Sequence, residues 1–113
     1  MQQRFAQQMK KGALDMLVLK LLEREEKYGY QLISELRERS GGAVSLKEGT
    51  LYPLLYRLED GGLVTSRTAA KTAKEPARKY YAITEQGRTV LGEMFEVWSE
   101  FNGCVESIME EER

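Results

Sequence analysis

Residues 67–79 carry five cationic side chains against one acidic side chain, Glu75. The cations are Arg67, Lys71, Lys74, Arg78 and Lys79. Residues 63–67 and 78–83 have the composition of strands, so the segment is predicted to be a hairpin with a long polar tip. Cations on a protruding hairpin suit DNA phosphates or a minor groove. The alternative is a solvated edge, because lysine on an edge strand also discourages aggregation.

A second candidate surface lies on a helix predicted between Ser45 and Asp60. Ser45 followed by Glu48 resembles a capping box, and Leu51, Leu55 and Leu58 form a narrow apolar stripe. The opposite face collects polar or compact side chains at Gly49, Thr50, Pro53, Tyr56 and Arg57, with Lys47 and Tyr52 near its edges.

These side chains can contact DNA in specific ways. Thr50 and Tyr52 can hydrogen-bond to phosphates or bases, and Arg57 can pair with a phosphate or bind guanine bidentately. Pro53 inside a helix lowers helix stability by about 3 kcal/mol. Such a loss is more expected on a functional face than elsewhere. The alternative reading of Pro53 is a kink required by packing.

The surrounding elements predict how these surfaces are positioned. One helix is expected from Phe5 to Glu23 and another from Tyr28 to Ser40, before the helix and hairpin above. Thr84 is expected to cap a last helix, which continues to about Met109 before a frayed acidic end. This order predicts a mostly α fold with a small β-hairpin, of the α+β class: a winged helix-turn-helix over residues 1–84 and a long coiled-coil-like helix over residues 85–113.

The last helix has a heptad seam of large apolar residues. Its members are spaced three and four residues apart: Leu91, Met94, Trp98, Phe101, Val105 and Ile108. So small a domain cannot cover such a stripe, so we expect it to pair with a second copy of the chain. A twofold homodimer would present two recognition helices to a palindromic double-stranded DNA site.

Composition excludes several other functions. The net charge of −1 hides an asymmetry: residues 1–84 hold 15 Lys and Arg against 10 Asp and Glu, whereas residues 85–113 hold 2 against 8. With no His and one Cys, neither a metal site nor an assembled catalytic group is predicted, so no cofactor and no enzyme activity are expected. No membrane span or signal sequence is recognised, and we expect a cytoplasmic protein. The main rival is a winged-helix protein–protein adaptor, which predicts neither the basic wing nor the free polar face.

Three motifs in order resemble the PadR-type transcriptional regulators. They are residues 28–32 (YGYQL), residues 49–64 with GTLYPLLYRLE followed by GLV, and residues 78–87 (RKYYAITEQG). The single C-terminal helix resembles the short subfamily. The resemblance implies a repressor, often of detoxification or efflux genes, that a small molecule releases. The wing tip, residues 69–77, lacks the glycines and the denser arginine run common in the family.

The resemblance also implies a ligand site around Trp98. In multidrug-sensing members, a Trp of the dimer helix stacks planar aromatic drugs at the subunit interface. The corresponding site here would use Met9, Asp15, Met16, Phe95, Trp98 and Asn102. Two facing Trp rings could enclose an aromatic ligand, and Asp15 would favour a cation. The alternative is that Trp98 only fills the dimer core.

Overall fold

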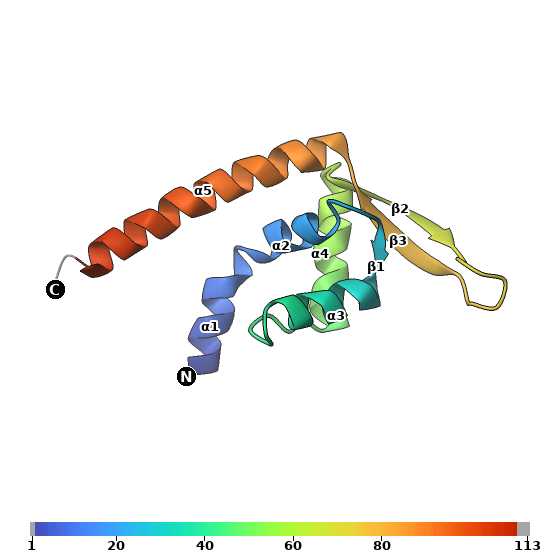
Figure 1. Ribbon diagram of the computed structural model, residues 1–113, viewed down its shortest axis with the longest axis horizontal. Coiled ribbons are helices and arrows are strands. Elements are labelled where there is room, and N and C mark those ends of the chain that lie inside the picture. The colour runs from blue at the N-terminus through green and yellow to red at the C-terminus, as the bar shows by residue number, and fades with distance from the viewer. Residues whose placement is uncertain (1, 111–113) are drawn as a thin grey trace.

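The computed structural model describes residues 2–110, which form an α+β fold with a three-stranded antiparallel sheet (Figure 1). Its elements in chain order are α1 (Gln2–Lys11), α2 (Leu14–Leu21), β1 (Lys27–Tyr28), α3 (Gly29–Arg39), α4 (Glu48–Asp60), β2 (Val64–Ala69), β3 (Arg78–Ile83) and α5 (Glu85–Glu110). The frayed end expected beyond residue 110 lies outside the described residues.

The sheet confirms the predicted hairpin and adds one short strand. Strands β2 and β3 pair in register from Val64 opposite Ile83 to Ala69 opposite Arg78. Strand β1 pairs with the other edge of β3, with Lys27 opposite Tyr81. Two residues are too short for an alternating pattern, so β1 carries no recognisable periodicity in the sequence.

The first predicted helix is wrong as a single element. The chain forms α1 and α2, separated at Gly12 and Ala13. Glycine is a poor helix former, and the N–H of Ala13 bonds the carbonyl of Lys10, three residues back. The expected helix is therefore divided into two short helices at this point.

The predicted start of the helix between Ser45 and Asp60 is also wrong. Helix α4 begins at Glu48 after an N-cap at Lys47 that makes no side-chain capping bond, so Ser45 does not cap it. Ser40 instead orders the loop before α4, because its hydroxyl oxygen accepts a hydrogen bond from the N–H of Val44 at 2.8 Å. The inner face of α4 is wider than predicted, since Leu54 is buried beside the expected leucines.

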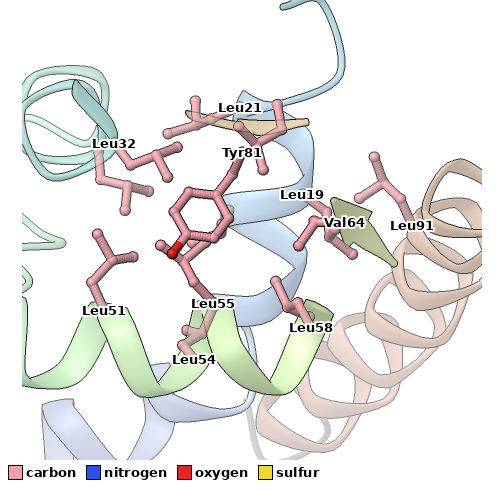
Figure 2. Packing of buried hydrophobic residues seen from close by; sticks show 13 residues of the cluster. Leu19, Leu21, Leu32, Leu51, Leu54, Leu55, Leu58, Val64, Tyr81 and Leu91 are labelled. Carbon is pink, nitrogen blue, oxygen red and sulfur yellow. The ribbon is translucent and has the colours of Figure 1, made fainter. Parts of the chain in front are cut away.

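One apolar core joins all the helices of the winged domain except α1 to the hairpin (Figure 2). Its fully buried side chains are Val18, Leu19, Leu22, Leu32, Leu51, Leu55, Val64 and Tyr81. The Tyr81 hydroxyl lies among leucines and has no hydrogen-bond partner among the described residues. Burial therefore raises the pKa of Tyr81, an effect that Lys79 partly offsets.

Helix α5 leaves this domain as an arm, so the molecule measures 61 × 32 × 21 Å (Figure 1). Thr84 anchors its start as predicted: its hydroxyl accepts the N–H of Gly87 at 2.9 Å and donates to the Gly62 carbonyl at 2.7 Å. At Gly87 a Cβ atom would lie 2.1 Å from the Leu63 carbonyl oxygen. The arm is therefore attached closely at its base, where it also packs on α2.

Candidate nucleic-acid interface

Helix α4 presents an open face beside the hairpin. Lys47, Thr50, Pro53, Tyr56 and Arg57 are all exposed, as the sequence predicted, while the leucines of the helix face the core. Gly49 adds no side chain and meets open space. A compact, polar face of this kind allows close approach of another molecule to the helix backbone.

Tyr52, expected near an edge of that face, turns its ring toward the core. It is half-buried and packs against the core. Its ring covers Gly29 so closely that a Cβ at Gly29 would lie 2.4 Å from the tyrosine hydroxyl oxygen. Tyr52 therefore holds α4 against the start of α3, and Gly29 makes room for it.

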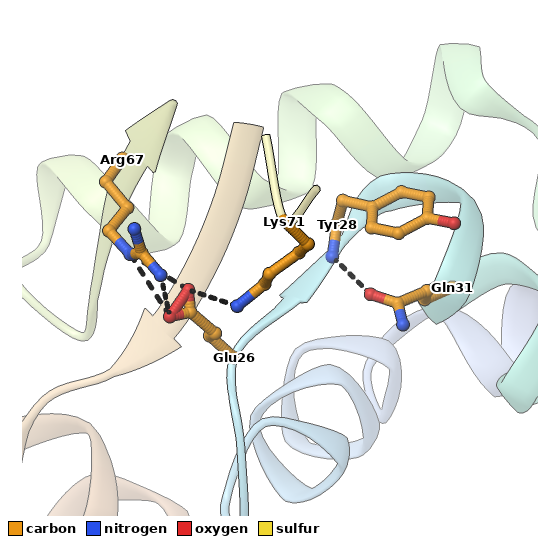
Figure 3. A network of polar contacts seen from close by, with 5 residues as sticks. All are labelled: Glu26, Tyr28, Gln31, Arg67 and Lys71. Atoms are coloured by element: carbon orange, nitrogen blue, oxygen red, sulfur yellow. Dashed lines mark hydrogen bonds and ion pairs between the residues drawn. The ribbon is translucent and has the colours of Figure 1, made fainter. Parts of the chain in front are cut away.

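Two of the five wing cations, one on β2 and one in the loop that follows it, form a polar cluster with Glu26 (Figure 3). Arg67 donates to both carboxylate oxygens of Glu26, from Nε at 3.0 Å and from Nη2 at 2.8 Å. The Lys71 ammonium lies 3.9 Å from the same carboxylate. Hydrogen bonding from Arg67 is the main reason that the pKa of the Glu26 carboxyl lies below its usual value.

The other wing cations differ in their surroundings. Arg78 lies over the Tyr28 ring, at 4.4 Å from its centroid. The Lys79 ammonium lies 5.3 Å from the Tyr56 ring of α4 and 5.5 Å from the Tyr81 ring, so it connects the wing to the open face. Lys74 is exposed at the tip and makes no ion pair within residues 2–110.

Arg57 is positioned by a residue from a different part of the chain. Its Nη2 donates to Oδ1 of Asp15, in the first turn of α2, at 2.8 Å. An ion pair this exposed contributes little to stability, about 0–1 kcal/mol. It does place the guanidinium at the corner where α2 meets α4.

Asp15 also lines a groove between the α1–α2 segment and α5. The groove collects four of the six residues expected around a ligand: Met9, Asp15, Met16 and Trp98. Phe95 lines a separate hollow with Leu17 and Leu91, and Asn102 is absent from the lining of either. The predicted ligand set is therefore brought together in part.

The heptad seam divides into an inner and an outer part. Leu91 is 7% exposed and belongs to the domain core, so it has almost no surface left for the partner contact expected of it. Met94 packs at the edge of that core. The remaining members are exposed: Trp98 (43%), Phe101 (67%), Val105 and Ile108.

The part of the chain that the structure describes holds neither a metal-binding cluster nor a membrane-spanning helix. No cluster of His, Cys, Asp or Glu with the geometry of a metal site is found among residues 2–110. None of the helices in that range is long and apolar enough to cross a membrane.

These elements define a winged helix-turn-helix: α3 and α4 pack in sequence, β2 and β3 form the wing, and α5 is an added arm. The family model described as "Transcriptional regulator PadR-like family" matches residues 18–93. The chain therefore belongs to the PadR-like family of transcriptional regulators, whose members are not enzymes.

Individual relatives agree with this assignment. A PadR-family regulator from Eggerthella lenta has a similar structure, with a TM-score of 0.84, 35% identity, and coverage of 96% of this chain and 92% of the other. The negative transcriptional regulator PadR of Bacillus subtilis is 35% identical over 66% of this chain and 40% of its own length. The structure of Bacillus subtilis PadR with operator DNA matches with a TM-score of 0.65 at 31% identity, over 74% of this chain and 47% of that one.

Two acidic partners were missed by the sequence reasoning. Glu26 lies 41 positions from Arg67 and Asp15 lies 42 positions from Arg57. No local spacing relates residues so far apart. An excess of acids in the α2–β1 segment, at Glu23, Glu25 and Glu26, was the available signal, and it did not identify which acid pairs with which cation.

Proposed function

We propose that the protein is a DNA-binding transcriptional repressor that recognises its operator with α4 and the wing. The main observation in support is that the exposed face of α4 lies beside the wing cations. Lys79 of the wing contacts the Tyr56 ring of α4 and so connects the two surfaces. Helix α4 would enter a major groove, with Thr50 and Arg57 facing base edges or phosphates. Lys71, Lys74 and Arg78 would follow the phosphate backbone.

The comparison with Bacillus subtilis PadR supports this proposal. That protein is described in complex with operator DNA, and its fold is shared over three quarters of this chain. The curated PadR relative is named a negative regulator, which favours repression here.

The exposed seam supports a homodimer on a palindromic operator. Trp98, Phe101, Val105 and Ile108 remain uncovered on one helix, and an apolar stripe of this length is rarely left to solvent. A twofold axis through the arms would separate the two α4 helices to read half-sites about one DNA turn apart.

A binding assay tests the proposal directly. The purified protein is titrated against a labelled fragment of its own upstream region at two salt concentrations, with unlabelled competitor DNA. We expect saturable binding that survives competitor and weakens with salt, because phosphate contacts release counterions. If neither this fragment nor a selection from random DNA yields a specific site, the protein–protein adaptor function replaces the proposal.

The Arg57→Ala variant tests whether this one side chain contributes to operator binding. Loss of a base or phosphate contact is expected to weaken operator binding by about 1–3 kcal/mol while leaving the dimer intact. Arg24→Ala removes an exposed cation that lies in the loop between α2 and β1 and lines a hollow with residues of α2 and α3, so it is the control for charge alone. Equal operator affinity for Arg57→Ala and the control would remove Arg57 from the interface.

The groove that Asp15 and Trp98 line, between the α1–α2 segment and α5 and called the α2–α5 groove below, supports a ligand-responsive repressor. Trp98 and Phe101 supply aromatic surface, Met9 and Met16 supply adaptable apolar surface, and Asp15 supplies negative charge. We infer that a planar aromatic effector binds in this groove and releases the protein from its operator. Titration of the single Trp, Trp98, by fluorescence with planar aromatic compounds tests binding. Because Trp98→Ala removes this signal, calorimetry measures that variant, in which binding is expected to be abolished.

A further inference from the structure

One carboxylate belongs both to the groove and to the candidate DNA-binding face. Asp15 lines the α2–α5 groove beside Met16 and Trp98, and the same side chain accepts a hydrogen bond from Arg57 of α4 at 2.8 Å. We propose that Asp15 is a positioning residue that holds Arg57 ready for DNA and couples groove occupancy to the recognition helix. This inference rests on the proposed function, since it gives the route by which a ligand would act on the operator.

The pattern of bonds indicates positioning rather than masking. Arg57 uses a single nitrogen, Nη2, for Asp15, and its side chain stays 62% exposed. Arg67 instead commits Nε and Nη2 together to the two oxygens of Glu26. A guanidinium has five N–H donors, so Arg57 keeps a whole edge for a base or phosphate. Arg67 has its Nε–Nη2 edge held by both oxygens of one carboxylate, a tighter restraint than the single bond on Arg57.

Holding a long side chain before DNA arrives favours binding. Arginine loses rotamer freedom when it contacts DNA, and a side chain already restrained by Asp15 loses less. The restraint comes from α2, which packs on both α5 and the core, so the position of Arg57 depends on an element outside the recognition helix.

The groove chemistry identifies the class of ligand that would break this restraint. Its described lining is apolar except for two carboxylates, Asp15 and Glu93, and includes no basic residue. A cationic aromatic ligand would stack on Trp98 and place its charge against Asp15. The carboxylate would then attract Arg57 less, and the guanidinium would lose its preferred position.

Asp15→Asn and Glu93→Gln form a matched pair for the test. Both carboxylates line the same groove and both changes remove one negative charge, but Glu93 makes no ion pair within residues 2–110. The two variants therefore gain the same net charge. The part of any difference that disappears when Arg57 is also removed reports the contact with Arg57.

Operator affinity is the first readout. We expect Asp15→Asn to bind the operator about fivefold more weakly than Glu93→Gln, and this difference to vanish when Arg57→Ala is added to both. Thermal unfolding of each variant confirms that the fold is intact. If Asp15→Asn binds as tightly as Glu93→Gln or more tightly, Asp15 does not position Arg57 and the inference is wrong.

Two probes of the same shape test the coupling. The 1-methylquinolinium cation and neutral 1-methylnaphthalene are titrated against Trp98 fluorescence. We expect the cation to bind more tightly in the unsubstituted protein and in Glu93→Gln, and this preference to be reduced in Asp15→Asn. Saturating cation should weaken operator binding by the unsubstituted protein but not by Asp15→Asn. Equal binding of both probes, or no binding of either, would overturn the coupling, as would an operator affinity that the bound cation does not change.

The outcomes distinguish failure of the proposed function from failure of the coupling through Asp15. An unsubstituted protein that binds no specific DNA refutes the proposed function, and the inference with it. Specific binding by the unsubstituted protein with equal affinity of the Asp15→Asn and Glu93→Gln variants refutes only the inference.

Discussion

The winged domain buries its apolar side chains, whereas the arm α5 leaves most of its own exposed. In the domain, leucines from α2, α3 and α4 meet Val64 and Tyr81 in one closed core. Of the 26 residues in α5, the buried ones are Gly87 and Leu91, both near its base. The outer half of the helix exposes a seam that begins at Trp98.

The difference shows where the protein requires a second molecule. A closed core stabilises the domain within one chain, because each apolar side chain has intramolecular neighbours. An isolated helix is marginal in water, since its hydrogen bonds barely offset the ordering of its backbone. We therefore expect changes in the domain core to alter folding, and changes in the outer seam to alter association.

Leu55→Ala is expected to have the largest effect on folding. Leu55 is fully buried between the helices and the sheet, so the substitution loses apolar burial and leaves a cavity. We expect the free energy of unfolding to fall by about 2–5 kcal/mol, measured by urea denaturation followed by circular dichroism. A loss below 1 kcal/mol would show that the core is less tightly closed than its burial indicates.

Phe101→Glu is expected to act on association instead. The charge would lie in the seam beside its symmetry mate, so the dimer dissociation constant should rise about 100-fold, or about 3 kcal/mol. Sedimentation across a concentration series measures it, with Glu96→Gln on the other side of α5 as the control. An unchanged dimer would place the interface away from the seam.

Gly87→Ala tests the joint between the two regions. The added Cβ would lie 2.1 Å from the Leu63 carbonyl and 2.7 Å from Cγ1 of Ile83, so the base of α5 must shift away from the hairpin. We expect a loss of about 1–3 kcal/mol in thermal unfolding. Gly92→Ala meets open space and should instead stabilise the helix by up to about 1 kcal/mol. Equal effects at the two glycines would contradict the close joint.

Tyr81→Phe is expected to have the smallest effect. The hydroxyl is buried without a partner among the described residues, so its removal relieves a desolvation cost and keeps the ring packing. We expect stability to be unchanged or higher by up to about 1 kcal/mol. A clear loss of stability in chemical denaturation would reveal a hydrogen bond made by this hydroxyl.

Most elements could be predicted because local patterns encode them. The glycines after α3 and α4 adopt positive φ, at 62° for Gly41 and 77° for Gly62, which is why they end these helices where the sequence indicated. Thr84 caps α5 through a hydrogen bond to Gly87, three residues away. Such signals depend on neighbours in the chain, so periodicity and capping chemistry suffice to recognise them.

The sequence alone therefore determined the order of elements, the open face of α4, the cations of the wing and the apolar seam. Tertiary structure decided the break at Gly12, the inward turn of Tyr52 onto Gly29, the burial of Leu91, and the pairing of Arg57 with Asp15 and of Arg67 with Glu26. Each of these depends on which distant segments meet in space. Helical periodicity predicts which residues share a face, but only packing determines what that face meets.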